Sequence, residues 1–168
     1  MNKVGIFYGS TTGNTESVAE MIKEKLGADI VDLHNVESAS VADMDTYQNL
    51  IFGTSTWGLG DLQDDFQDFI SGLADADLSG KVVALYGLGD SSAYADTFVD
   101  GMGEIYESIQ GNGCKIVGSV ASDEYDFEDS KAFVDDEFVG LPLDEENEGD
   151  KHAERVEAWI ESIKPELN

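Results

Sequence analysis

Apolar residues follow two patterns along this chain, and the two alternate. Short continuous runs rich in Val, Ile, Leu and Phe occupy residues 3–8, 29–33, 49–54, 81–87 and 115–120. Runs that are apolar throughout, rather than at every second position, are typical of strands in a parallel sheet covered on both faces. They therefore predict five buried parallel strands.

Between and after these runs, apolar residues recur every three or four positions, which predicts amphipathic helices. The predicted apolar faces are Val18, Met21, Ile22 and Leu26; Phe66, Phe69, Ile70 and Leu73; Phe98, Met102, Ile105, Tyr106 and Ile109; and Val156, Trp159, Ile160 and Ile163. Alternating strands and helices give an α/β three-layer sandwich around a doubly wound sheet. With 168 residues, no repeat and no Pro-, Gly- or Ser-rich linker, we expect a single domain over residues 1–168.

One segment breaks the alternation. Residues 121–137 are acidic and follow neither pattern, and an apolar run resumes at residues 138–143. A loop inserted into the last strand explains this better than a sixth strand. Loops of this length in compact domains are more often functional than incidental.

Acidic residues dominate the composition, with 36 acidic against 9 basic residues and a net charge of −27. Nucleic acid binding is strongly disfavoured because phosphate neutralisation needs Lys and Arg, and the chain has a single arginine, Arg155. Anionic membrane surfaces are disfavoured for the same reason, and no apolar run approaches the ~20 residues of a membrane span. The acidity has two open explanations: solubility or adaptation to high salt, and steering toward basic partner proteins.

The single cysteine, Cys114, excludes an internal disulfide and a multi-cysteine iron–sulfur or zinc site. The N-terminal residues enter a strand pattern at once and lack the features of a signal peptide, so a cytoplasmic location is expected. His34 and His152 have no neighbours in sequence that suggest catalysis, and we expect both to be solvated. The carboxylates of residues 123–129 are interpreted as a solvated loop, so no metal site is predicted.

The first candidate site follows the first strand. In an open parallel sheet, ligands bind at the carboxyl ends of strands. Here Gly9-Ser10-Thr11-Thr12-Gly13-Asn14-Thr15 leads directly into a helix, whose N-terminal N–H groups favour a phosphate. A helix cap needs one hydroxyl residue, whereas this turn has four. The turn has neither the Gly-Lys-Ser/Thr ending nor the GxGxxG spacing, so a mononucleotide phosphate fits best.

Two further loops each place an aromatic among small residues at the same edge. Thr54-Ser55-Thr56-Trp57-Gly58-Leu59-Gly60-Asp61 follows the third strand, and Gly87-Leu88-Gly89-Asp90-Ser91-Ser92-Ala93-Tyr94 follows the fourth. An aromatic in such a loop is poorly placed for the core. Trp57 and Tyr94 together, beside a phosphate turn, predict a flat ring held between them by stacking.

These three loops resemble the three FMN loops of flavodoxins. The matching motifs are Ser10-x-Thr12-Gly13-x-Thr15, Thr56-Trp57-Gly58, and Gly87-x-Gly89-Asp90 followed by Tyr94. The resemblance covers the whole chain, and the break in the last strand resembles the insertion of the long-chain subgroup. It implies a strand order of 2-1-3-4-5 with FMN at the switch point between strands 1 and 3. It also implies a one-electron carrier, not an enzyme, and a monomer is expected. The net charge adds two expectations, a low potential and basic redox partner proteins.

The resemblance also assigns roles to residues. The turn around Thr12 would bind the FMN phosphate, Thr56 and its neighbours the ribityl chain, and the loop near Asp90 the pyrimidine edge. Trp57 and Tyr94 would enclose the ring, and the peptide after Gly58 would turn its carbonyl toward flavin N5 on reduction. The full set of expected FMN contacts is Ser10, Thr11, Thr12, Gly13, Asn14, Thr15, Ser55, Thr56, Trp57, Gly58, Leu59, Gly60, Leu88, Gly89, Asp90, Tyr94 and Phe98.

Three other classes of protein were weighed against this one. A receiver domain needs acidic residues after the first strand and an Asp after the third, where Gly9-Ser10 and Gly53-Thr54 stand. A flavodoxin-like NAD(P)H:quinone reductase stays open, although no basic residue is placed for a second dinucleotide phosphate, and NADPH oxidation would identify it. A pure interaction module would be colourless and take up no FMN.

Overall fold

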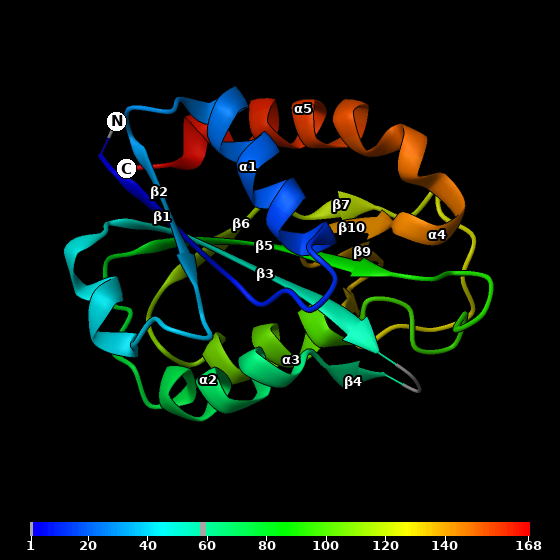
Figure 1. The fold of residues 1–168 in the computed structure, drawn as a ribbon, viewed down its shortest axis with the longest axis horizontal. Helices are drawn as coiled ribbons and strands as arrows, with labels where there is room; N and C mark the ends of the chain where they lie inside the picture. Colours follow the sequence, from blue (N-terminus) through cyan, green and yellow to red (C-terminus); the bar gives the residue numbers. More distant parts are fainter. Residues whose placement is uncertain (1, 58–59) are drawn as a thin grey trace.

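The computed structural model describes residues 2–57 and 60–168 of the chain. A central sheet is covered on one face by α1 (Asn14–Leu26) and α5 (His152–Ile163), and on the other by α2 (Asp64–Ala74) and α3 (Asp100–Ile109) (Figure 1). This is the predicted three-layer sandwich. Asn2 N–H donates to the carbonyl of Asn168 at 2.8 Å, so the two ends of the described chain meet at one end of the sheet.

The main sheet is mainly parallel, and its strand order confirms the predicted winding. Its central path runs β10 (Leu141–Asp144), β5 (Val82–Gly89), β3 (Asn49–Trp57), β1 (Val4–Tyr8), β2 (Val31–Asn35). β6 (Lys115–Val117) also pairs with β5. Since β6 pairs along the first half of β5 and β10 along the second, two short strands share the fifth position. The remaining short elements outside the insertion are η1 (Val41–Thr46), β4 (Asp61–Leu62), α4 (Glu145–Glu148), η2 (Gly149–Lys151) and η3 (Lys164–Glu166).

The core lies in two layers, one on each face of the sheet. Val4, Ile6 and Tyr8 of β1 pack into the layer under α1 and α5. Phe7, between them in sequence, packs into the layer over α2 and α3. Because successive strand residues point to opposite faces, a strand buried on both sides must be apolar throughout. Burial on both faces therefore explains why the strands appear in the sequence as continuous apolar runs.

Several strand ends differ from the sequence-based expectation. β2 begins at Val31 rather than at residue 29, because Gly27 ends α1 with φ 137° and the chain turns through residues 28–30 first. β3 continues past Thr54 to Trp57, where it pairs with the antiparallel β4. β5 continues to Gly89 because β10 pairs with its last residues. Both extensions carry strands toward the edge where the predicted ligand loops lie.

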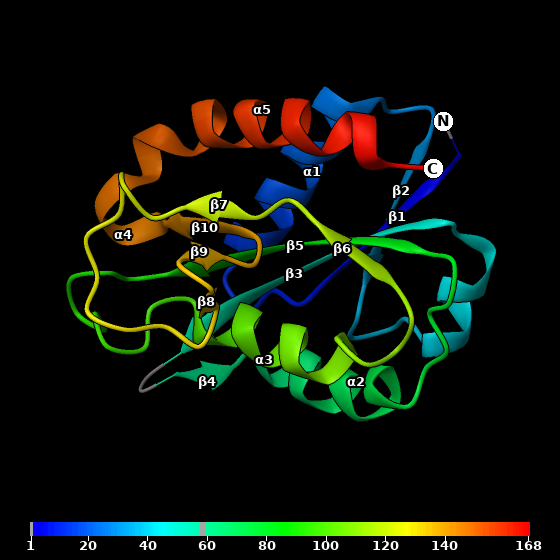
Figure 2. The ribbon, with the colours of Figure 1, turned by 180° about the vertical axis from the view of Figure 1, so that it is seen from behind.

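The inserted segment is larger and more ordered than expected. The chain leaves the sheet at Gly118, which has φ 87° and whose carbonyl accepts a hydrogen bond from Trp159 Nε1 at 2.9 Å. It forms a small antiparallel sheet in the order β7 (Val120–Ala121), β9 (Glu137–Phe138), β8 (Phe133–Val134) before β10 begins (Figure 2). Val120, predicted to end the fifth strand, therefore belongs to this second sheet.

An aromatic cluster anchors the insertion. Phe138 is fully buried, with ring centroids of Phe127 and Tyr125 at 4.9 and 5.3 Å, and Phe98 at 6.0 Å from before α3. The Lys131 N–H also donates to the buried Asp100 carboxylate at 2.8 Å. The aromatic side chains of the insertion are thus packed near α3, while the carboxylates of residues 123–129 are exposed to solvent as expected. Among the described helices, none combines the length and apolar composition needed to cross a bilayer.

Candidate functional site

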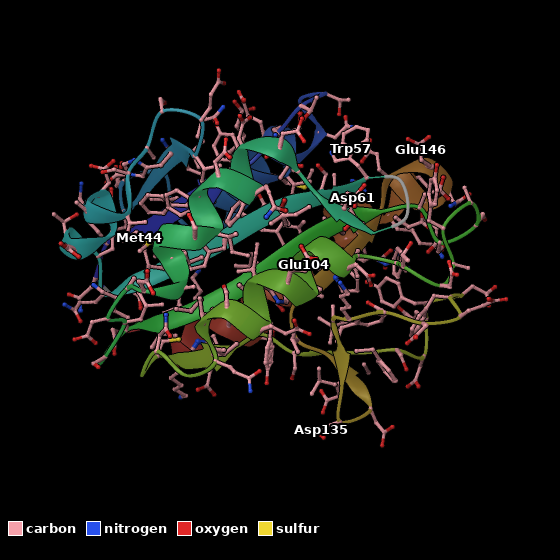
Figure 3. All side chains as sticks on the ribbon, turned by 90° about the horizontal axis from the view of Figure 1, so that it is seen from below. Met44, Trp57, Asp61, Glu104, Asp135 and Glu146 are labelled. Atoms are coloured by element: carbon pink, nitrogen blue, oxygen red, sulfur yellow. The ribbon has the colours of Figure 1, made fainter. Side chains whose placement is uncertain are left out.

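A cavity of about 220 Å³ opens at the carboxyl edge of the sheet. The turn between β1 and α1, the last residues of β3 and β5, the loop after β5 and the short α4 contribute its lining: Thr12, Asn14, Ser55, Thr56, Trp57, Leu88, Gly89, Asp90, Tyr94, Glu145 and Glu146. Figure 3 shows Trp57 and Glu146 close together at this end, with Met44 at the other. All lining residues except Glu145 and Glu146 are ones that the sequence predicted. The three loops therefore meet as expected.

The turn before α1 is held by contacts from below. A Cβ at Gly9 would overlap the side-chain oxygen of Gln63. Gln63 is fully buried, and its Nε2 donates a hydrogen bond to Thr11 Oγ1 at 3.1 Å. Thr15 is buried in the first turn of the helix, where its carbonyl accepts a hydrogen bond from Tyr86 Oη at 2.9 Å. Buried side chains from two other elements thus fix the position of this turn.

The helix end itself is free to bind an anion. Gly13 occupies the N-cap position with φ 91°, and no side chain caps the helix. The Gly13 N–H itself donates a hydrogen bond to Ser10 Oγ at 3.1 Å. The first N–H groups of a helix have no intrahelical acceptor, and they favour a bound anion. Thr12 and Gly13 are exposed beside them. Of the described lining residues none is Lys or Arg, so an anion would be bound by hydrogen bonds and the helix dipole.

Two aromatic side chains are exposed at the cavity. Trp57 is 41% exposed and Tyr94 39%, and Val134 is the one other large hydrophobic residue in the described chain that is comparably exposed. Trp57 Nε1 donates to Ser55 Oγ at 2.8 Å, which orients the indole from within its own loop. Two exposed aromatic side chains that line one cavity suit a flat aromatic ligand.

Asp90 shapes the loop that carries Tyr94. Its Oδ1 accepts hydrogen bonds from the N–H groups of Ala93 and Ser92, both at 3.0 Å, and from Asn147 Nδ2 at 2.9 Å. The Ala93 N–H contributes most to holding the pKa of the Asp90 carboxyl below its usual range, with Asn147 and Ser92 also lowering it. Asn147 Nδ2 also donates to Asp144 at 2.8 Å, so α4 ties this loop to the end of β10.

Some predicted contacts lie elsewhere. Phe98 is 1% exposed and packs among the aromatics of the insertion, so its assignment to the cofactor is corrected: it is a core residue. Gly60 donates its N–H to the Trp57 carbonyl at 3.2 Å and is not among the described residues that line the cavity. Gly58 and Leu59 lie outside the described residues. In the turn before α1, Thr12 and Asn14 line the cavity. The other predicted contacts of this turn are their neighbours in sequence: Ser10, Thr11, Gly13 and Thr15.

Comparison with known proteins identifies the family. A profile described as flavodoxin matches residues 6–159. The chain belongs to the flavodoxin family. Flavodoxin from Nostoc sp. is 48% identical over 165 residues, which cover 98% of this chain and 97% of the relative. Flavodoxin 1 from Escherichia coli K12 is 44% identical over 98% and 94% of the two chains.

Solved structures agree with this assignment. The crystal structure of Fusobacterium nucleatum flavodoxin bound to flavin mononucleotide superposes with a TM-score of 0.95 at 32% identity, covering 100% of both chains. Its K13G mutant, also bound to flavin mononucleotide, gives the same TM-score at 33% identity. The flavodoxin fold predicted from the sequence is confirmed.

This flavodoxin has two cavity residues that the sequence analysis missed. Glu145 and Glu146 lie in α4, directly after β10. The rule that ligands bind at strand carboxyl ends would have found them, had the fifth strand been predicted to end at Asp144 rather than residue 143. Acidic side chains at the cavity bring negative charge close to any bound ligand.

Both histidines of this flavodoxin are packed, so the expectation that they are solvated was wrong. His34 is half-buried, stacked on Phe7 with ring centroids 4.5 Å apart, and its Nε2 lies 2.7 Å from Tyr47 Oη. His152 is 7% exposed. Among the described residues, no group of three or more His, Cys, Asp and Glu side chains is placed to hold a metal ion.

Proposed function

We propose that this protein is a low-potential one-electron carrier that holds one non-covalent FMN in the cavity at the carboxyl edge of the sheet. One observation carries the proposal: the exposed Trp57 and Tyr94 share a cavity with the uncapped N-terminus of α1. Two aromatic side chains and a free helix N-terminus in one cavity fit a ligand with a flat ring at one end and a phosphate at the other. The FMN-bound Fusobacterium flavodoxin supports the same ligand.

Each segment then has a part in binding FMN. Ser10, Thr11, Thr12, Gly13, Asn14 and Thr15 bind the phosphate, and Ser55 and Thr56 bind the ribityl chain. Trp57 and Tyr94 cover the ring, and Leu88, Gly89 and Asp90 meet its pyrimidine edge. Gly58, Leu59 and Gly60 are also proposed as FMN contacts; the first two lie outside the described residues.

FMN supplies the redox chemistry, because its ring can accept electrons singly. The chain's own residues orient the ring and exclude water from its faces. Membership of the flavodoxin family supports an electron carrier rather than an enzyme. Glu145, Glu146 and Asp90 oppose further negative charge in the cavity, which supports a low potential.

We expect the purified protein to be yellow and to contain one FMN per chain. Apoprotein titrated with FMN should quench flavin fluorescence to a 1:1 endpoint, and excess FMN at 100 times its Kd should stabilise the fold by about 2.7 kcal/mol. Absorbance and thermal unfolding measure the two effects. Apoprotein that stays colourless would contradict the proposal, and steady NADPH oxidation by the pure protein would favour a quinone reductase instead.

We further propose that the redox partners are basic proteins. The net charge of −27 and the carboxylates at the cavity would attract them over long range. Electron transfer to a basic cytochrome should slow by at least tenfold between about 10 mM and about 500 mM salt. Stopped-flow absorbance measures these rates.

A matched pair of variants locates the effect. Glu146→Gln removes a charge at the cavity, whereas Asp135→Asn removes one at the tip of the β8–β9 hairpin, away from Trp57 (Figure 3). The first should slow the low-salt rate more than the second. A rate that ignores salt would leave the acidity explained by solubility or salt adaptation alone.

Three finer proposals accompany this function. The insertion between β6 and β10 supports assignment to the long-chain subgroup. The protein is proposed to be a monomer, which sedimentation equilibrium tests directly. A cytoplasmic location is proposed because the lone cysteine, Cys114, forms no internal disulfide that would need an oxidising compartment.

A further inference from the structure

His152, the first residue of α5, is an unusual buried histidine. Its side chain is 9% exposed, and Nδ1 lies 3.1 Å from Glu145 Oε2. Its other nitrogen, Nε2, is buried and has no hydrogen-bond partner among the described residues. Buried polar atoms without partners are rare in folded proteins and call for an explanation.

The geometry favours the neutral form of His152 near neutral pH. With the proton on Nδ1, the ring donates to Glu145 and leaves only a lone pair buried at Nε2. A second proton would place a buried N–H donor there without an acceptor, which is unfavourable. Burial likewise lowers the pKa of His152 below its ordinary 6.5.

Charged groups face His152 from several elements. Glu145 of α4, Asp144 at the end of β10 and Asp150 of η2 favour its protonated form. Arg155, one turn further along α5, opposes it. Because Arg155 is itself paired with Glu148 at 3.1 Å, the surroundings of His152 are negative overall. Burial therefore favours the neutral imidazole, and the nearby carboxylates favour the protonated one.

Glu145 joins His152 to the cavity. Its carboxylate contacts His152, and the same residue lines the cavity with Trp57 and Tyr94. Negative charge added in the cavity raises the free energy of the Glu145 carboxylate and of every anion around it. A proton on His152 offsets that cost through the 3.1 Å contact.

We propose that His152 is a positioning residue for electron transfer, which holds the Glu145 carboxylate at the cavity and binds a proton when bound FMN is reduced. The proton comes from solvent and binds at Nε2, while the electron stays on the flavin and none passes through the imidazole. This inference rests on the proposed function. The sign follows from linkage: between the oxidised-state and reduced-state pKa values of His152, lower pH favours reduction, and outside that window His152 contributes no pH dependence.

The test is a histidine NMR titration of the FMN-loaded protein, oxidised and fully reduced, between about pH 5 and pH 8. The proton affinity of His152 should rise by about threefold or more on reduction. His34, the other histidine, is not among the residues lining the cavity and serves as internal control in the same spectra. Its pKa should change much less.

Variants separate a proton site from a structural contact. His152→Asn keeps an N–H donor near the position of Nδ1 but cannot titrate, so the potential of this variant should lose the pH dependence that His152 contributes. Glu145→Gln should lower the pKa of His152 even in the apoprotein, where no flavin is needed for the readout. Equal His152 pKa values in the two redox states, or an unchanged pH profile in His152→Asn, would overturn the proposal.

The two levels of inference fail in different ways. A protein that takes up no FMN shows this in its visible spectrum, and this result overturns the proposed function and the redox role of His152 together. A yellow, redox-active protein whose His152 ignores the flavin overturns the second alone.

Discussion

Replacing Trp57 by alanine is expected to weaken FMN binding by about 60-fold, while the apoprotein keeps its free energy of unfolding. The indole is 41% exposed without ligand, so its removal leaves no core cavity. In the complex it would lose roughly 100 Å² of apolar contact, worth about 2.5 kcal/mol at about 25 cal/mol per Å². Fluorescence titration of the apoprotein with FMN measures the first effect and urea unfolding the second.

Two controls show that the loss at Trp57 comes from stacking. Trp57→Phe keeps an aromatic face and should weaken FMN binding by less than about tenfold. Val134→Ala removes the comparably exposed residue of β8, outside the cavity lining, and should leave FMN affinity unchanged. If Trp57→Ala instead unfolds the apoprotein, the indole is structural and the assignment to the flavin site is wrong.

Gly53→Ala is expected to destabilise the apoprotein by about 3 kcal/mol, mainly through overpacking. A Cβ at Gly53 in β3 would overlap the ring of Tyr86, which is fully buried in the neighbouring β5. The ring would have to move, and the hydrogen bond from Tyr86 Oη to the Thr15 carbonyl would be lost. The transition temperature should fall by roughly 6–12 °C, as measured by circular dichroism.

A double-mutant cycle tests the cause of that loss. In a Tyr86→Leu background the ring is absent, so Gly53→Ala should cost much less than in the wild type. Gly149→Ala adds a methyl group where no atom lies within 4 Å, and should change stability by no more than about 1 kcal/mol. If the losses of unfolding free energy from Gly53→Ala and Tyr86→Leu are additive, the proposed overlap of the two side chains is wrong. Because Thr15 lies in the phosphate turn, we also expect Gly53→Ala to weaken FMN binding.

Most of the site could be predicted because its residues stand in continuous segments. The turn around Thr12 and the aromatics Trp57 and Tyr94 each follow a strand, and parallel strands bring their carboxyl ends to one edge. Local sequence therefore placed three separate loops together without any knowledge of side-chain packing. Phe98 was misassigned because an aromatic near these loops can equally turn into the core, and only its neighbours decide which.

The insertion could be located but not described. Its aromatics, Tyr125, Phe127, Phe133 and Phe138, follow no helical or strand period, since they come from a loop and two very short strands. They pack against one another and against Phe98, which precedes all of them by more than twenty positions in the sequence. Hydrophobic periodicity reveals the buried face of a helix or strand, but it does not reveal burial between irregular segments.

The sequence by itself determined the alternation of strands and helices, and hence the edge where a ligand binds, because these depend on backbone geometry repeated over a few residues. Only the tertiary structure decided that α4 completes the cavity, through Asn147 bonded to Asp90 fifty-seven positions earlier. It alone decided that His152 is buried against Glu145. Burial and charge at a point in space are sums over all the segments that meet there, and no single segment carries that sum in its own residues.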